Sequence, residues 1–494
     1  MPSATAGGAP GARRDLGPCL CILYGGTGDL ARRKVLPALY RLHASRAAEN
    51  CYVLAVSKGG ELNDASYREV VVEALANAGI ARDDAGRWAD ARLAYYPARG
   101  ARGSDFASLA ARVAEIEQRH QLAGNRVFYL ALPPAAFGPT AAGLAEAGLS
   151  RGPGWARIVI EKPFGRDLDS AHALNATLHH GWQEPQIYRI DHYLGKETVQ
   201  NLLVFRFANA MFESIWNRSH VARVEITVAE ELGVERRAGY YEQAGALRDI
   251  VQNHLTQLLS LVAMEAPIAL TADAIRAEKV KALRSIRAIH PRQVVWGQYG
   301  AGRLDGAAVA AYRAEPGVAP DSNTETFIAI RLDVDSWRWQ GVPFVLRAGK
   351  RMPKRLTEIT LTFREPPVSL FGRFDACRPE SDALVIRLQP DEGFALYFDV
   401  KRPGSDFSLA HQPLHFKYSE AFGPLPEAYE TLLMDVFEGD QTLFVHAEEV
   451  EESWRLYSPL LTTPHPVVPY PSGSWGPREA DRLVADGTVL RREA

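Results

Sequence analysis

Cysteine is scarce in this sequence, and the four that are present do not form a metal-binding pattern. Cys19 and Cys21 lie two apart in an apparent strand, and no second pair accompanies them at the spacing that zinc sites use. We therefore expect no metal site. Reduced thiols buried in a core are typical of cytoplasmic proteins, so the sequence predicts a cytoplasmic protein.

Long hydrophobic runs and an excess of one charge are also missing. No apolar stretch approaches the roughly 18 residues that a membrane-spanning helix needs, and the N-terminal residues 1–17 lack the hydrophobic segment of a secretory signal. Lys and Arg number 56 and Asp and Glu 59, a formal net charge of −3, which indicates neither a nucleic-acid nor a membrane partner. Rich in Gly, Ala and Pro, residues 1–17 are expected to form a disordered tail.

The composition is that of an ordinary globular protein, in a chain too long for one core. Its 494 residues are 47% hydrophobic and 23% charged. The apolar run CLCILY (Cys19–Tyr24) leads into GGTGDLARRKVLPALYRL, whose apolar residues have helical spacing, and then into the strand-like CYVLAVS (Cys51–Ser57). This order is typical of a Rossmann-like, doubly wound α/β domain, which we place at residues 18–190. Further strands are expected at 126–132, 156–163 and 186–190.

Residues 191–494 have a different pattern. Helical stretches at 239–264 and 271–288 are followed by runs of alternating polarity, TEITLTFRE, ALVIRLQP and FALYFDVK, which are typical of a half-buried antiparallel sheet. We therefore predict an α+β domain with a large, mostly antiparallel sheet that leaves one face open. Such a face is a natural surface for a homodimer or homotetramer.

A glycine-rich turn joins the first strand to the first helix. It contains G-x-G-x-x-A, from Gly26 through Gly28 to Ala31. Glycines let a backbone approach a pyrophosphate, and a small third residue lets the helix pack closely on the strand. Because the match follows a strand and opens a helix, it indicates dinucleotide binding rather than a structural turn. The expected cofactor contacts are Gly25, Gly26, Thr27, Gly28, Asp29 and Leu30.

The run RIDHYLGKE places four chemically active side chains within six positions: Asp191, His192, Tyr193 and Lys196. If a helix starts here, His192 and Lys196 share a face near its N-terminus, where free N–H groups and the helix dipole attract anions. A phosphate could then be bound by ammonium, imidazole, phenol and backbone together. A solvated helix cap with an ion pair is the alternative, and the segment alone does not separate the two.

Three other segments have two interpretations each. Lys162 in EKPFG follows a strand at the edge where ligands of parallel sheets collect, or is a loop lysine beside a proline. His254 lies in the apolar stripe of the helix ALRDIVQNHLTQLLSLV (Ala246–Val262), with Asp249 nearby. It is either a residue of the core or a base that takes a hydroxyl proton. The basic run RAGKRMPKR (Arg347–Arg355) is a solvated loop or a clamp for an anion or hydroxyl.

Seven segments together resemble the glucose-6-phosphate dehydrogenase family. They are GGTGDLARRKVLPALY, EKPFGRDLDSA, RIDHYLGKETVQN, LGVERRAGYYEQAGALRDIVQNH, GVPFVLRAGKRMP, GDQTLFVHAEEVEESWR and GSWGP. They come in the family's order, and RIDHYLGKE and GGTGDLA are specific to it. The resemblance implies hydride transfer from C1 of glucose 6-phosphate to NADP+, giving 6-phospho-D-glucono-1,5-lactone, the first step of the oxidative pentose phosphate pathway.

The resemblance also implies a role for each candidate residue. His254 is expected to act as the general base, oriented by Asp191. Lys162 is expected to bridge substrate and nicotinamide. The remaining residues are expected to contact the phosphate and hydroxyl groups of the substrate. They are His192, Tyr193, Lys196, Glu230, Asp249 and Lys350.

Two departures from the family pattern affect ligand contacts. A second substrate lysine usually stands five residues after the first, and here that position is Arg355, with Lys354 beside it; either cation could contact the substrate. After the second strand the family usually has an arginine for the 2′-phosphate of NADP+, where this chain has Ser57 and Lys58. Because ammonium and hydroxyl groups attract that phosphate, we expect NADP+ to be preferred and NAD+ to be used more weakly.

Two alternatives stay open. A different Rossmann sugar oxidoreductase, of the glucose–fructose oxidoreductase type, also has an EKP segment before an open sheet, but it gives no reason for the DHYLGK run. A catalytically silent protein that binds NADP+ as a sensor or assembly partner would not need the full set of candidate catalytic residues.

Overall fold

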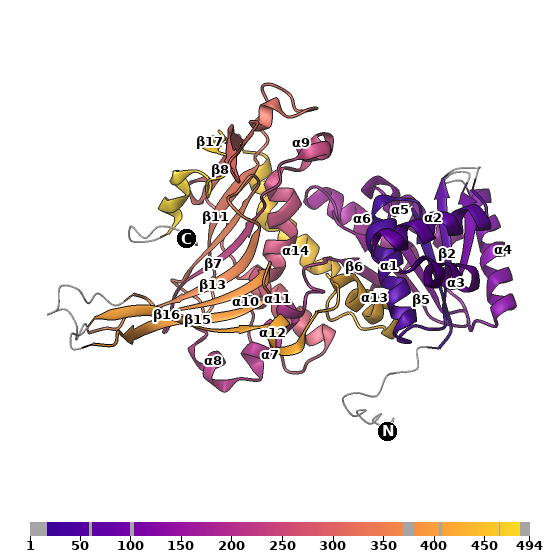
Figure 1. Cartoon of the computed structure of the whole chain (residues 1–494), viewed down its shortest axis with the longest axis horizontal. Helices are drawn as coiled ribbons and strands as arrows, with labels where there is room; N and C mark the ends of the chain where they lie inside the picture. The colour runs from indigo at the N-terminus through magenta and orange to yellow at the C-terminus, as the bar shows by residue number, and fades with distance from the viewer. Residues whose placement is uncertain are drawn as a thin grey trace. The chain divides into compact units, whose positions relative to one another are not determined.

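The structure is a computed structural model that describes residues 17–58, 62–98, 103–368, 380–404, 408–463 and 465–484. The tail expected at 1–17 falls outside these residues except for Gly17, and Cys377 also lies outside them. The chain divides into two compact units (Figure 1). The first unit comprises Met1–Phe164, His172–Gly195 and Glu427–His446, and the second comprises Gly165–Ala171, Lys196–Pro426 and Ala447–Ala494.

The first unit is built on a parallel sheet with the strand order β3-β2-β1-β4-β5-β6. Its strands are β1 (Cys19–Tyr24), β2 (Cys51–Lys58), β3 (Leu93–Ala98), β4 (Arg126–Leu130), β5 (Ala156–Glu161) and β6 (Ile187–Ile190). All neighbouring strands in this sheet pair in parallel. A parallel sheet is buried on both faces, which is why CLCILY reads as a continuous apolar run. The predicted doubly wound α/β fold is confirmed.

Helices connect these strands. They are η1 (Ala31–Val35), α1 (Leu36–Ala44), α2 (Asp64–Asn77), α3 (Arg82–Arg92), α4 (Gly103–His120), η2 (Pro134–Ala136), α5 (Phe137–Glu146), α6 (Leu168–Gly181) and η3 (Glu184–Gln186). One further helix of this unit, α13 (Ala428–Glu438), comes from late in the sequence, and Arg157 donates to the carbonyl oxygen of Val436 there at 2.6 Å. The predicted domain boundary at residue 190 remains a prediction. In the structure, residues 191–195 and 427–446 pack with the first unit.

The second unit contains a large mixed sheet with the order β16-β15-β14-β13-β7-β12-β11-β8-β17. Its strands are β7 (Val221–Ala229), β8 (Val294–Gly300), β11 (Phe327–Asp333), β12 (Pro343–Gly349), β13 (Leu356–Phe363), β14 (Ala383–Gln389), β15 (Gly393–Lys401), β16 (Leu409–Lys417) and β17 (Val468–Pro471). The pairs β7–β12 and β8–β17 are parallel, and the other neighbours are antiparallel. The predicted α+β character is confirmed. A small hairpin joins β9 (Gly302–Leu304) to β10 (Ala307–Val309).

The helices of the second unit are α7 (Glu197–Phe207), α8 (Ala210–Ile215), η4 (Glu235–Arg237), α9 (Ala238–Ala246), η5 (Leu247–Leu255), α10 (Thr256–Ala263), α11 (Ala272–Arg284), η6 (Pro291–Gln293), η7 (Tyr312–Ala314), α12 (Tyr418–Phe422), α14 (Ala447–Leu461) and η8 (Arg478–Leu483). Over the described residues, we find no helix with both the length and the apolarity that crossing a membrane requires.

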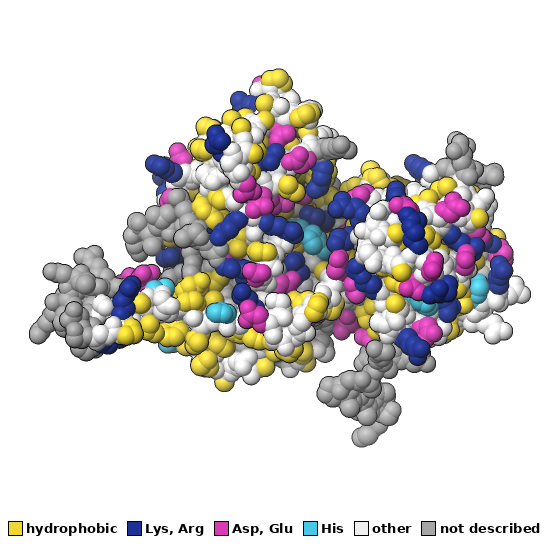
Figure 2. All heavy atoms as spheres, in the orientation of Figure 1, with side chains coloured by type: hydrophobic (Ala, Val, Ile, Leu, Met, Phe, Trp, Pro, Cys, Tyr) yellow, Lys and Arg dark blue, Asp and Glu magenta, His cyan; other side chains and the backbone are white. Residues whose placement is uncertain are grey.

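Burial within the large sheet decreases toward β15 and β16. Every residue of β12 is buried, whereas those of β15 and β16 are mostly half-buried or exposed. Figure 2 shows hydrophobic side chains gathered at this end of the sheet. Leu414 of β16 is 64% exposed, and Phe394 and Phe416 stack across the two strands.

Candidate active site

The glycine turn after β1 is shaped by close packing within the first unit. Gly25 has a φ of +74°, and a Cβ there would lie 2.1 Å from the carbonyl oxygen of Ala131. A Cβ on Gly26 would lie 2.8 Å from the Cβ of Ala55. A Cβ on Gly28 would approach only the Gly25 oxygen, at 3.0 Å, among the residues described. The backbone at Gly28 is therefore open to a ligand at the start of a helix, which is where a pyrophosphate binds in this fold.

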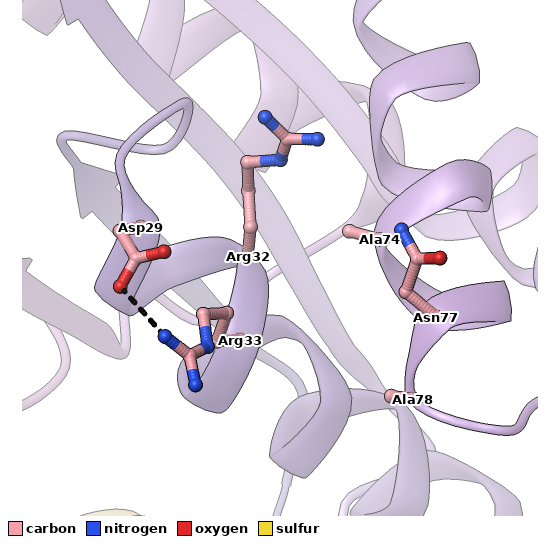
Figure 3. Close-up of a pocket in the computed structure, with 6 residues that line it drawn as sticks. All are labelled: Asp29, Arg32, Arg33, Ala74, Asn77 and Ala78. Carbon is pink, nitrogen blue, oxygen red and sulfur yellow. Dashed lines mark ion pairs between the residues drawn. The ribbon is translucent and has the colours of Figure 1, made fainter. Parts of the chain in front are cut away.

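A cavity of about 520 Å³ lies beside this turn, between its helix and the end of α2 (Figure 3). Its lining residues are Asp29, Arg32, Arg33, Ala74, Asn77 and Ala78. Arg33 pairs with Asp29 at 3.5 Å, while Arg32 extends separately from that pair. Neither arginine was predicted from the sequence to contact a ligand. Their position one helical turn after the glycines could have indicated cations close to the phosphates of a cofactor.

The end of β2 exposes Lys58 but not Ser57. Ser57 is 7% exposed, and its hydroxyl donates to the Tyr95 hydroxyl at 3.2 Å. Lys58, the last residue of the strand, is exposed. Residues 59–61, which include the acidic Glu61, lie outside the described part of the chain. Of the two residues expected to meet a 2′-phosphate, Lys58 is therefore the accessible one.

β5 ends in a buried carboxyl group, and Lys162 follows at the carboxyl edge of the sheet. The carboxylate of Glu161 accepts hydrogen bonds from the hydroxyls of Tyr129 at 2.6 Å and Tyr429 at 3.2 Å. Burial raises the pKa of Glu161 to about 7. The two tyrosines and the charge of Lys162 lower this pKa, whereas the charge of Asp191 raises it. Lys162 follows β5 at the carboxyl edge of the sheet, as expected, and its role in ligand binding stays a prediction.

The run RIDHYLGKE does not begin a helix at its histidine. Helix α7 begins at Glu197 with Lys196 as its N-cap, so the interpretation that His192 and Lys196 share a helix face is wrong. The cause is local, because the Asp191 carboxylate accepts a hydrogen bond from the Tyr193 N–H at 3.0 Å. An aspartate that bonds the backbone two residues on forms a turn that competes with helix formation.

Residues 192–195 of this run are held within the first unit by packing. A Cβ on Gly195 would lie 2.8 Å from the carbonyl oxygen of Ala428 and 2.8 Å from Cγ of Leu432, so α13 approaches the turn closely. The ring centres of His192 and Tyr193 lie 5.0 Å apart, with an angle of 62° between the ring planes. His192 is half-buried and Tyr193 is 6% exposed. The structure therefore brings this imidazole and phenol together.

Lys196 lies near a second cation in the second unit. Its ammonium donates to the carbonyl oxygen of Leu388 at 3.2 Å and pairs with Glu392 at 3.6 Å. Burial lowers the pKa of Lys196; the charge of Glu392 opposes this effect and that of Arg355 adds to it. Arg355 donates to Gln389 at 3.1 Å. Two cations separated in sequence thus form hydrogen bonds with adjacent residues, Leu388 and Gln389, at the end of β14.

Two neighbouring parallel strands bring Glu230 and Lys350 together. The register of β7 and β12 pairs Ala229 with Gly349, and each strand is followed by one of the two charged residues. The Lys350 ammonium donates to the Glu230 carboxylate at 2.6 Å and lies 5.0 Å from the centre of the Tyr241 ring. This pair presents one acceptor and one donor for hydroxyl groups.

The predicted helix that carries Asp249 and His254 is present, and the part that holds both residues is a π-helix. The π-helical part, η5, spans Leu247–Leu255. Its i→i+5 winding brings residues five apart closer to one face, and π-helical turns are frequent at functional sites. Asp249 is 4% and His254 is 1% exposed, and the Tyr240 hydroxyl donates to Asp249 at 3.3 Å.

The first turn of η5 is held by a residue from elsewhere in the second unit. The Glu325 carboxylate accepts from the Leu247 N–H at 3.1 Å, and its carbonyl oxygen accepts from the Ala246 N–H at 3.1 Å. Gly245 has a φ of +62°, and a Cβ there would lie 2.2 Å from that carboxylate. Burial raises the pKa of Glu325 to about 7, and the Leu247 hydrogen bond opposes this effect. The apolar periodicity contains no signal for this contact.

In the first unit, a glycine turn after the first strand of a parallel sheet and a lysine at the carboxyl edge of that sheet are typical of dehydrogenases that bind a nicotinamide dinucleotide. Comparison with known families agrees with this class. The family model described as glucose-6-phosphate dehydrogenase, NAD binding domain, matches residues 22–201, and the model of the family's C-terminal domain matches residues 203–490. The chain belongs to the glucose-6-phosphate dehydrogenase family.

Individual relatives match over nearly the whole chain. Glucose-6-phosphate 1-dehydrogenase of Aggregatibacter actinomycetemcomitans is 42% identical, with 96% of this chain and 97% of the relative covered. The Bacillus subtilis protein of the same name is 43% identical, with 94% and 96% covered. Among solved structures, a glucose-6-phosphate dehydrogenase in complex with its substrate glucose-6-phosphate is 33% identical, with a TM-score of 0.88 and 96% of this chain and 99% of that chain covered.

Proposed function

We propose that the protein oxidises D-glucose 6-phosphate at C1, with transfer of the hydride to NADP+ and release of 6-phospho-D-glucono-1,5-lactone. The observation that carries this proposal is the placement of Asp249 and His254 on one buried π-helical segment, in a chain of the glucose-6-phosphate dehydrogenase family. The similar solved structure contains glucose 6-phosphate as its substrate.

His254 is the proposed general base. Loss of a hydride from C1 requires that the hydroxyl on the same carbon give up its proton, and an imidazole can accept it near neutral pH. Asp191 is proposed to orient the imidazole. Asp249, whose carboxylate is held by the Tyr240 hydroxyl, is proposed to accept from a sugar hydroxyl.

The 6-phosphate is proposed to bind to cations and to neutral donors. Lys196 and Arg355 supply two positive charges, and His192 and Tyr193 supply an imidazole and a phenol. The Lys354 ammonium lies 6.0 Å from the centre of the Trp475 ring, whereas Arg355 donates to Gln389, the residue after the one that Lys196 bonds. This arrangement favours Arg355 over Lys354 as the second cation.

Glu230 and Lys350 are proposed to contact the sugar hydroxyls as a pair. Their 2.6 Å hydrogen bond holds both groups at the edge of the sheet before a sugar arrives. Because the acceptor and the donor are already oriented, less side-chain entropy is lost on binding.

The cofactor is proposed to bind along the turn Gly25–Leu30, with Lys58 facing the 2′-phosphate and Lys162 facing both nicotinamide and substrate. The open backbone at Gly28 and the exposed ammonium of Lys58 fit a phosphorylated dinucleotide. Bound there, the nicotinamide accepts the hydride that leaves C1. We expect NADP+ to be preferred and NAD+ to be used more weakly, because lysine lacks the bidentate fork of arginine.

A direct assay tests this function. Purified protein with NADP+ should show an increase of absorbance at about 340 nm that depends on glucose 6-phosphate. Free glucose serves as the matched substrate without phosphate, and its kcat/KM should be far lower. Comparable values for the two substrates would favour an oxidoreductase of the glucose–fructose type. Cofactor binding without turnover would favour a silent sensor.

We further propose a homodimer or homotetramer that forms through the β15–β16 end of the large sheet. Its support is the exposure of Leu414 and Phe422, at 64% and 71%. Light scattering after size exclusion should show an oligomer that Leu414→Asp weakens, and a monomeric wild type would contradict the proposal. We also propose that the protein acts in the cytoplasm, which the free thiols of Cys19, Cys21 and Cys51 support.

A further inference from the structure

Glu161 is a buried carboxyl group that the proposed mechanism does not use. It is the last residue of β5, it is 8% exposed, and the strand register places it beside Ile190 of β6. The next residues of these two strands, Lys162 and Asp191, therefore leave the sheet at the same edge. A carboxyl group directly behind two proposed site residues can change the electric field at both of them.

The groups around this carboxyl come from several parts of the first unit. Tyr129 of β4 and Tyr429 of α13 donate to the same oxygen, Oε1, at 2.6 and 3.2 Å. Lys162 follows it on its own strand and favours the ionised form, whereas Asp191, which follows β6, favours the protonated form. With burial as the largest effect, the pKa of Glu161 is about 7. The carboxyl group therefore changes its charge within the working range of an enzyme.

Tyr429 belongs to a helix that is tied to other parts of the proposed site. Immediately before α13, Glu427 pairs with Lys34 of η1 at 2.8 Å, and Glu430 pairs with Arg41 of α1 at 3.0 Å. The same helix packs against Gly195. α13 thus contacts the helices that follow the cofactor turn, the turn of the DHYLG run, and Glu161.

We propose that Glu161 is a positioning residue for the dehydrogenase reaction, which acts through its charge on Lys162 and Asp191 and is held in place by Tyr129 and Tyr429. This inference rests on the proposed function. Ionised Glu161 attracts the Lys162 ammonium and repels the Asp191 carboxylate, and protonated Glu161 does neither. The activity should therefore contain an ionisation that belongs to Glu161 and is separate from that of the base.

Three variants test the proposal. Glu161→Gln keeps an acceptor for the tyrosines and removes the charge. Tyr429→Phe removes one hydrogen bond that favours the ionised carboxylate and keeps the ring. Tyr188→Phe is the matched control, because Tyr188 is a buried tyrosine of β6 whose ring packs against Phe444. For each variant, kcat and kcat/KM are measured from about pH 5.5 to 9.

In the wild type we expect kcat/KM to show an ionisation near neutral pH that Glu161→Gln abolishes. Tyr429→Phe should move it upward by about 0.5 to 1 pH unit, since loss of a hydrogen bond to the charged form disfavours that form. Tyr188→Phe should leave it in place. A profile unchanged in Glu161→Gln, or a Tyr429→Phe profile that matches the control, would overturn the proposal.

Infrared spectroscopy supplies a second readout that needs no turnover. The wild type should show one more carbonyl band of a protonated buried carboxylic acid than Glu161→Gln, and this band should disappear as pH rises through neutrality, whereas the band of Glu325, which titrates in the same range, should be present in both proteins. In Tyr429→Phe the midpoint of the Glu161 band should rise. A wild-type spectrum identical to that of Glu161→Gln at all pH values would overturn the proposal. Because this titration requires no substrate, its failure and the failure of the proposed function are separate results.

Discussion

Lys350 donates to Glu230 across 2.6 Å, at the edge where the parallel strands β7 and β12 end side by side. Neither residue is near the other in sequence, and the strand pairing alone brings them together. Their side chains are 8% and 35% exposed, so the ammonium is shielded from water and the carboxylate only partly so. The pair is therefore a test both of the fold and of the proposed sugar contacts.

Lys350→Met should remove this hydrogen bond and retain the packing of the side-chain stem. We expect the free energy of unfolding to fall by about 1 kcal/mol, because solvent screens the remaining Glu230 charge. We expect kcat/KM for glucose 6-phosphate to fall by about tenfold. Urea unfolding and steady-state kinetics give the two values. A double-mutant cycle with Glu230→Gln checks the pair, since zero coupling energy would show that it contributes nothing.

Lys196→Ala should act mainly on the affinity for glucose 6-phosphate and scarcely on cofactor binding. One lost charge-assisted hydrogen bond should reduce kcat/KM by roughly one to two decades, about 1.5–3 kcal/mol. Lys354→Ala is the matched control, because its ammonium is directed toward Trp475. Equal kinetics for the two variants would leave the phosphate assignment without support.

His254→Asn should lower kcat by roughly 10²–10⁴-fold, the usual contribution of a general base, and change KM far less. Circular dichroism checks that the variant is folded. The half-buried His43, whose Nδ1 lies 3.1 Å from the carbonyl oxygen of Glu49, provides the control His43→Asn. If His254→Asn keeps the wild-type kcat, or unfolds, His254 is a residue of the core.

Lys58→Ala should erase most of the preference for NADP+ by weakening NADP+ alone. A lysine contributes a point charge to the 2′-phosphate, so the wild-type preference should also shrink as salt rises. The measurement is kcat/KM for both cofactors at low and high ionic strength. A wild-type enzyme with the higher value for NAD+ would show that Lys58 does not select the cofactor.

Glu325→Gln should stabilise the protein increasingly as pH rises. The pKa of Glu325 in the folded protein is about 7, above its ordinary 4.5, so its stabilising contribution is complete below about pH 4.5 and is lost as pH rises through about 7. Glutamine still accepts from the Leu247 N–H. The variant should therefore gain on the order of 2 kcal/mol relative to the wild type between about pH 5 and 8, measured by urea unfolding. A difference that does not depend on pH would contradict this assignment.

Features whose partners lie close in sequence were predictable. Strand Cys19–Tyr24 has the bounds that its apolar run predicted, and the glycine turn and helix follow it as expected. The alternating polarity also located β13, β14 and β15. These elements are determined by burial of a periodic apolar face and by the conformational freedom of glycine. Both are properties of a short segment of sequence.

The sequence by itself determined the fold class, the family and which residue types stand at the candidate site. Only the tertiary structure decided how these residues are held. Tyr429 reaches Glu161 from 268 positions away, and Glu325 fixes the start of η5 from 78 positions beyond Leu247. Local helix preference amounts to a fraction of a kcal/mol per residue, so contacts with buried carboxylates outweigh it. Where such contacts come from distant segments, local periodicity cannot reveal the winding that they impose.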